Sequence, residues 1–174
     1  EVIKINNKLE SVNITVPKIK KVNEDLGLIL MSDFGKKVYL DNLNNETVFC
    51  LYTDAIDVIH NMQNNINTSD LSYFDIREQK DEINLFIDWF LKNHIGYDDE
   101  KLDDIGIEEI LTNLLEKIDG IPKKFIHRDY HSRNLMLLEK GNPGVLDYQD
   151  AMTGPITYDL VSLLKDCYIK WDDE

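Results

Sequence analysis

Residues 126–135 read IHRDYHSRNL and are the most informative stretch of the chain. An apolar run precedes this polar segment and another follows it, which predicts short buried strands with a loop between them. Within that loop, the carboxylate of Asp129 can accept the proton of an attacking hydroxyl group. The amide oxygen of Asn134 can reach a metal ion on the far side of the same loop. The pattern therefore favours a site that combines a general base with a metal ligand.

A second acid, Asp147, follows the apolar residues 144–146, and the segment KGNPG at residues 140–144 predicts a turn before it. We expect a hairpin that places Asp147 beside the loop, where it can share Mg²⁺ with Asn134. Phosphoryl transfer needs a positioned nucleophile and metal charge on the phosphate oxygens. A His-x-Asp sequence alone is common, but the complete pattern with its flanking strands and downstream acid predicts a phosphotransferase site.

Residues 125–171 resemble the aminoglycoside phosphotransferase/choline kinase superfamily, whose members are small-molecule relatives of the protein kinases. His131 stands where serine/threonine protein kinases usually carry Lys, and eleven residues between Asp147 and Asp159 leave no room for a long activation segment. The segments LDYQDA (146–151), GP (154–155) and YDL (158–160) look most like those of the bacterial kinases of cell-wall amino sugars. That group phosphorylates the anomeric hydroxyl of N-acetylmuramate or N-acetylglucosamine.

The resemblance implies an α+β, protein-kinase-like fold, with a remnant of the small lobe and the hinge at residues 1–34 and the mostly helical large lobe at residues 35–174. It implies ATP and Mg²⁺ as cofactors, with adenine bound by the backbone of Ser32 and Phe34. Asp33-Phe34-Gly35 copies a kinase metal motif but precedes the catalytic loop, so we expect Asp33 to lie in the hinge and not to bind metal.

The expected roles in the site are Asp129 as catalytic base, Asn134 and Asp147 as metal ligands, and His127 and Asp159 as structural supports of the loop. Asp150 is either a second acid near the metal or the acceptor, or a structural residue. The role of His131 stays open.

Hydrophobic spacing predicts helices at residues 1–12, 45–62, 78–93 and 107–118, and another after Pro155. Strands are expected at residues 14–19 and 28–31, and residues 97–104 are expected to form a solvated acidic connection. In the third of these helices we expect Phe86, Trp89 and Phe90 to face inward. Cys50 and Cys167 lie on apolar faces of predicted helices, so we expect two buried, reduced thiols.

The chain has 174 residues and a net charge of −14, which argues against nucleic acid as a partner. It contains no stretch long enough for a membrane span and no recognisable signal peptide, so we expect a cytoplasmic protein with a small-molecule acceptor. Two alternatives to an amino-sugar kinase stay open: a choline- or aminoglycoside-type kinase, and a non-catalytic nucleotide-binding module. The joint presence of Asp129, Asn134 and Asp147 argues against the module, which needs no base.

No Gly-rich phosphate loop precedes the hinge, where Gly27 and Gly35 are the only glycines. Lys4 and Lys8 fall on a predicted helix and are poor candidates for the lysine that holds the phosphates. We therefore interpret the chain as the central piece of a kinase and expect this piece alone to be inactive.

Overall fold

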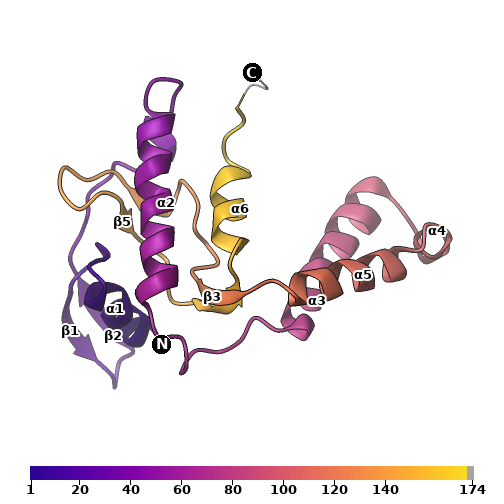
Figure 1. Ribbon diagram of the computed structural model, residues 1–174, viewed down its shortest axis with the longest axis horizontal. Helices are drawn as coiled ribbons and strands as arrows, with labels where there is room; N and C mark the ends of the chain where they lie inside the picture. The colour runs from indigo at the N-terminus through magenta and orange to yellow at the C-terminus, as the bar shows by residue number, and fades with distance from the viewer. Residues whose placement is uncertain (172–174) are drawn as a thin grey trace.

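The longest helix, α2 (Val48–Asn65), packs against β3 (Lys123–Ile126) and α6 (Tyr158–Leu164) in the computed structural model, which describes residues 1–171. Its buried side chains recur every three or four residues, as an amphipathic helix requires; they are Leu51, Tyr52, Ala55, Ile59 and Met62. The last helix, α6, contacts α2, and Figure 1 shows the two standing side by side.

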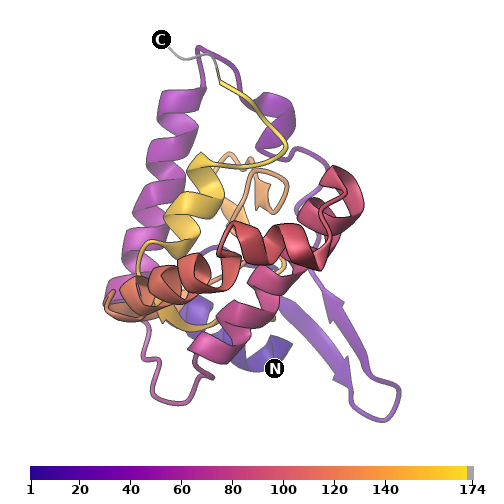
Figure 2. The same ribbon diagram turned by 90° about the vertical axis from the view of Figure 1, so that its right-hand side faces the viewer.

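The N-terminal part consists of helix α1 (Val2–Ser11) and an antiparallel hairpin of β1 (Ile19–Asn23) and β2 (Leu28–Met31). Figure 2 shows this hairpin extending away from the helices. Gly27 closes the turn with a φ of 63°, a conformation that glycine adopts without strain. The predicted strand at residues 14–19 is shifted in the structure, since β1 begins at Ile19 and Thr15 forms only an isolated bridge with Gly144.

Two further antiparallel pairs frame the catalytic motif. Strand β3 (Lys123–Ile126) pairs with β6 (Met152–Pro155), with Phe125 opposite Thr153. Strand β4 (Leu135–Met136) pairs with β5 (Gly144–Val145) and forms the predicted hairpin. The loop at residues 127–134 therefore leaves one sheet and enters the other, as the apolar runs on its two sides indicated.

A group of helices projects from this body (Figure 1): α3 (Ile76–Leu85), the π-helical η2 (Phe86–Ile95), α4 (Asp99–Asp104) and α5 (Ile107–Asp119). Asp75 caps α3 by accepting hydrogen bonds from the backbone N–H groups of Arg77 and Glu78. A short 3₁₀ turn, η1 (Leu40–Asn42), precedes α2. No helix within residues 1–171 has both the length and the apolar composition that crossing a membrane requires.

One hydrophobic core joins α1, α2, α6 and the strands around the catalytic loop. Ile5 and Leu9 of α1 are fully buried in it, together with Phe125, Tyr130 and Leu135. The core thus crosses residue 34, where the sequence predicted a boundary between lobes.

Several expectations about burial are wrong. Phe86, Trp89 and Phe90 are exposed, Trp89 at 68%, because no described element covers the outer face of η2. Cys50 and Cys167 are exposed free thiols. By contrast, the acidic side chains of residues 97–104 are exposed, as expected of a solvated connection. This segment also forms a short helix, α4, which Asp98 caps by accepting from the backbone N–H of Lys101.

Candidate active site

Asp129 lies in the loop between β3 and β4 with its carboxyl group partly buried. Burial raises the pKa of this carboxyl above its ordinary value, and the nearby negative charge of Asp147 raises it further. A carboxylate with a raised pKa is a stronger proton acceptor when it is ionised. This environment suits the role of base.

Asn134 joins the loop to the second acid. Its Nδ2 atom donates to the backbone oxygen of Asp129 at 3.0 Å and lies 3.4 Å from Oδ2 of Asp147. Because the nitrogen end of the amide is held in this way, the Oδ1 atom is left as a free acceptor among the described residues. Asp147 itself has a φ of 61°, a strained conformation for a non-glycine residue that proteins keep mainly at functional sites.

The donors around Asp147 fit a magnesium ion. A carboxylate and an amide oxygen are hard ligands of the kind that Mg²⁺ prefers, and Mg²⁺ usually keeps several water or phosphate ligands. Within residues 1–171, no group of three or more His, Cys, Asp or Glu side chains could hold a metal by itself. A metal at Asn134 and Asp147 would therefore be completed by phosphate oxygens and water.

Gln149 was missed by the sequence analysis. Its Nε2 atom donates to Oδ1 of Asp147 at 2.8 Å and lies 3.4 Å from Oδ2 of Asp150. The amide thus joins two acids of the segment that follows β5. The sequence feature that could have identified Gln149 is its position between Asp147 and Asp150. Asp150 is exposed, and its role remains the open prediction made above.

Asp159, in the first turn of α6, is fully buried and holds the start of the loop. Its Oδ2 accepts from the backbone N–H of His127 at 2.8 Å, and its Oδ1 accepts from that of Arg128 at 3.1 Å. Burial raises the pKa of Asp159 to about 7, although these two donors oppose the rise. Arg128 has a φ of 78°, so this bracing holds a strained backbone next to Asp129.

His127 is buried behind the loop, and burial lowers its pKa to about 4, so the ring is neutral near pH 7. Its ring packs edge-on against Tyr130, with the centroids 5.5 Å apart. The hydroxyl of Tyr130 donates to the backbone oxygen of Ala55 at 2.9 Å, which fixes the loop to α2. These contacts agree with a supporting role for His127.

The sequence profile of the Phosphotransferase enzyme family matches residues 4–174. The chain belongs to this family. It is 36% identical over 171 residues to the N-acetylmuramate/N-acetylglucosamine kinase of Pseudomonas aeruginosa, covering 98% of the chain and 50% of that relative. It is also 36% identical over 180 residues to the enzyme of the same name from Neisseria meningitidis, covering 99% and 52%. The chain spans about half the length of these curated relatives.

Solved structures of other kinases share the fold. An ADP-bound aminoglycoside phosphotransferase, APH(2'')-Ib, superposes with a TM-score of 0.66 at 18% identity, covering 95% of the chain and 59% of that structure. The choline kinase LicA of Streptococcus pneumoniae superposes with a TM-score of 0.61 at 14% identity, covering 93% and 54%. The predicted α+β, protein-kinase-like fold is therefore confirmed, as is the family resemblance.

In this member of the phosphotransferase family, a salt bridge ties the catalytic loop to α3. The guanidinium of Arg128 pairs with Glu82, whose other oxygen accepts from the hydroxyl of Tyr158 at 3.3 Å. The same guanidinium lies over the ring of Phe74, 5.3 Å from its centroid. Glu82 was not singled out from the sequence, since one acid among several on a predicted helix carries no signal.

The segment predicted to form the hinge follows β2. The backbone N–H of Ser32 donates to the backbone oxygen of Lys18 at 2.9 Å. In return, the backbone N–H of Lys18 donates to the Ser32 hydroxyl at 2.8 Å. Oδ1 of Asp33 accepts from the N–H of Gly35 at 2.8 Å, and Gly35 turns the chain with a φ of 85°. The carboxylate of Asp33 thus stabilises the turn in which it lies. The ring of Phe34 packs closely against Gly144, since a Cβ atom there would lie 2.8 Å from it.

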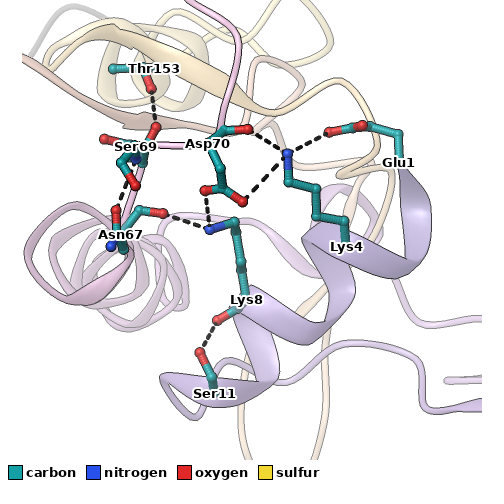
Figure 3. Close-up of polar contacts among 9 residues, drawn as sticks. Glu1, Lys4, Lys8, Ser11, Asn67, Ser69, Asp70 and Thr153 are labelled. Atoms are coloured by element: carbon teal, nitrogen blue, oxygen red, sulfur yellow. Dashed lines mark hydrogen bonds and ion pairs between the residues drawn. The ribbon is translucent and has the colours of Figure 1, made fainter.

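The two lysines of α1 bind a distant loop (Figure 3). Lys8 Nζ donates to the backbone oxygen of Asn67 and to Oδ1 of Asp70, both at 2.7 Å. Lys4 Nζ donates to the backbone oxygen of Asp70 and lies 3.5 Å from its Oδ2. Both ammonium groups are therefore engaged in attaching α1 to the loop after α2, as expected of lysines that do not hold phosphate.

Proposed function

We propose that the protein is an ATP-dependent kinase that phosphorylates a hydroxyl group of a small molecule, namely an amino sugar of the N-acetylmuramate or N-acetylglucosamine type. The observation that carries this proposal is the Asn134 amide, whose nitrogen binds the backbone of Asp129 and approaches Asp147. One side chain thereby links the backbone of the proposed base to the second acid. A module that only binds nucleotide has no use for this arrangement.

In this mechanism Asp129 orients the acceptor hydroxyl and accepts its proton as the phosphoryl group is transferred. Asn134 and Asp147 would hold Mg²⁺, which supplies positive charge to the phosphate oxygens when it is bound. Asp159 and His127 keep the loop rigid, so that little reorganisation is needed during transfer. Asp150 lies close enough to contribute to the raised pKa of Asp129, so it is proposed as part of the acidic environment of the site.

For adenine we propose the hinge at Ser32 and Phe34. Within residues 1–171, the N–H of Phe34 donates no hydrogen bond, whereas the N–H of Ser32 donates to the backbone oxygen of Lys18. We therefore assign the donor role to Phe34. The proposed division into a small-lobe remnant (residues 1–34) and a large lobe (residues 35–174) is supported by the turn at Gly35.

The amino-sugar acceptor is supported by the relatives, which carry that substrate in their names and match nearly the whole chain at 36% identity. Aminoglycoside and choline kinases remain alternatives, although their likeness below 20% identity supports the fold only. The net charge of −14 supports a partner other than nucleic acid, and the supply of ATP favours a cytoplasmic location.

The test is turnover of ATP·Mg²⁺ by the complete gene product, followed by ³¹P NMR. Acceptors are N-acetylglucosamine, N-acetylmuramate, choline and an aminoglycoside. The matched control is the methyl glycoside of N-acetylglucosamine, whose anomeric oxygen is blocked. We expect a sugar 1-phosphate from the two free sugars and no product from the glycoside.

Each other outcome has a distinct meaning. Equal phosphorylation of the methyl glycoside would contradict transfer to the anomeric hydroxyl. Turnover of choline or the aminoglycoside alone would favour the alternative acceptors. Saturable ATP binding without turnover of any acceptor would favour the non-catalytic module.

A further inference from the structure

The segment that follows α6 contacts the catalytic loop. In Figure 2 this segment (yellow) leaves the end of α6, swings to one side and then runs toward the C-terminus. Asp166 is only 7% exposed and uses one oxygen, Oδ2, to accept from both the backbone N–H and the hydroxyl of Ser132. Its other oxygen accepts from the backbone N–H of Tyr168 at 2.9 Å. The carboxylate therefore fixes both the loop and its own segment.

Two aromatic residues complete these contacts. The ring of Tyr168 packs edge-on against His131 at 5.2 Å between centroids, and the Arg133 guanidinium lies 4.8 Å from its centroid. Nε1 of Trp171 donates to the hydroxyl of Tyr52 in α2 at 3.2 Å. Residues 166–171 are called the clasp from here on.

We propose that the clasp positions the catalytic loop, with Asp166 and Tyr168 as positioning residues for the metal ligand Asn134. This inference rests on the proposed function for its catalytic consequence. The contacts run from Asp166 to Ser132 and from Tyr168 to His131, whose Nε2 lies 3.5 Å from Nδ2 of Asn134. Both routes end on the part of the loop that lies between Asp129 and β4.

With the clasp in place, a buried carboxylate binds the loop on each side of Asp129. Asp159 accepts backbone N–H groups just before Asp129, and Asp166 accepts one just after it. Asp129 is thus the free carboxylate between two buried ones that are committed to backbone donors. Loss of Asp166 would leave a buried N–H and a buried hydroxyl of Ser132 without partners, which favours local rearrangement of the loop.

The first measurement does not depend on turnover. Hydrogen exchange, followed by mass spectrometry on peptides covering residues 127–134 and residues 48–65, is compared for the wild-type gene product and Asp166→Ala. We expect exchange in the loop to accelerate about tenfold or more while exchange in α2 is unchanged. Asp81→Asn, which changes an exposed acid on α3, should leave both peptides unchanged.

The second measurement separates positioning from general destabilisation. Asp166→Ala should lower kcat by about 10- to 100-fold while the KM for ATP stays within about twofold. Ser132→Ala removes only the hydroxyl donor and should have a smaller effect. The double variant should be no slower than Asp166→Ala, because both changes break the same contact. Tyr168→Ala should lower kcat, whereas Tyr168→Phe, which retains the ring, should stay near wild type.

Unchanged loop exchange in a folded Asp166→Ala protein would overturn the proposal, as would additive effects of Asp166→Ala and Ser132→Ala. If Tyr168→Phe lowered kcat as much as Tyr168→Ala does, the ring contacts of Tyr168 would have no part in positioning the loop. If Asp166→Ala does not fold, the exchange and kcat of Ser132→Ala decide the matter. If the gene product phosphorylates none of the acceptors, the proposed function fails, and the exchange data still decide whether the clasp orders the loop.

Discussion

Asp129 and Asp147 belong to one site, yet they should respond differently to the same substitution. Asp129→Asn is nearly isosteric, so the fold and the binding of ATP·Mg²⁺ should survive. An amide cannot accept the proton of the acceptor, so we expect kcat to fall by about 10²–10⁴. Steady-state kinetics with a nucleotide-binding titration checks this. A variant that keeps near wild-type kcat would show that Asp129 is not the base.

Asp147→Asn should produce a defect that depends on metal. Loss of one carboxylate weakens the affinity of the site for Mg²⁺, so the rate should recover partly at high Mg²⁺ or with Mn²⁺. Asp33→Asn is the matched control, because Asp33 binds the backbone N–H of Gly35 in its own turn. If the rate of Asp33→Asn recovered at high Mg²⁺ and that of Asp147→Asn did not, Asp33 would be the metal ligand in place of Asp147.

Asp159 gives the stability of the protein a pH dependence. Its pKa is about 7 in the folded chain and 3.8 in the reference state, so the folded state binds this proton more tightly. The contribution to stability is therefore complete below about pH 4 and is lost as the pH rises to about 7. We expect Asp159→Asn to flatten the fall of Tm across this range, measured at constant ionic strength. Asp81→Asn should keep the wild-type slope, and an equally steep fall in Asp159→Asn would contradict the assignment.

Individual residues differ in how well the sequence predicts them. Asp129, Asn134 and Asp147 stand at spacings that follow from the chemistry of transfer, and the structure brings them together. Asp166 has no such signal, because it acts through Ser132, thirty-four residues away in the chain. Long-range contacts of this kind appear only when the fold is known.

At the level of elements, the hairpin of β4 and β5 connects the proposed metal site to the proposed hinge. Gly144 of β5 leaves no space for a side chain, since a Cβ atom there would lie 2.8 Å from both Phe34 and Leu138. Gly144→Ala should displace the Phe34 ring and raise the KM for ATP several-fold, with a smaller change in kcat. Steady-state kinetics measures both constants. Gly120→Ala is the matched control, because its nearest neighbour would lie at an ordinary 3.5 Å. Equal KM values for ATP in the two variants would show that the position of the Phe34 ring does not affect nucleotide binding.

The helices show what hydrophobic periodicity can and cannot predict. The predicted helices that became α1, α2 and α5 are confirmed, because their apolar residues recur at helical spacing. The same pattern predicted a buried Trp89, which is 68% exposed. Periodicity identifies an apolar face, but it does not say which element covers that face.

At the level of the whole molecule, we expect the triphosphate to need more positive charge than the proposed site supplies. Asn134 and Asp147 are proposed to hold a metal, and both lysines of α1 are engaged with the loop at Asp70. We expect residues 1–174 expressed alone to transfer phosphate at less than about a hundredth of the rate of the complete gene product, because an unanchored γ-phosphate loses its alignment. The comparison uses ³¹P NMR with N-acetylglucosamine. Comparable rates would show that this chain holds the triphosphate unaided.

Asp159 lies in the first turn of α6 and Asp166 lies two residues beyond its end at Leu164, so the length of this helix sets the interval between two carboxylates that bind the same loop. Each added or removed residue between them would swing one carboxylate by about 100° around the helix axis. We therefore expect the length of this interval to be more constrained than its composition. An alignment of relatives should show no gaps between these two acids and varied residues at the exposed positions 161, 164 and 165. A library of single-residue insertions in this interval should yield inactive proteins, whereas substitutions at those exposed positions should be tolerated.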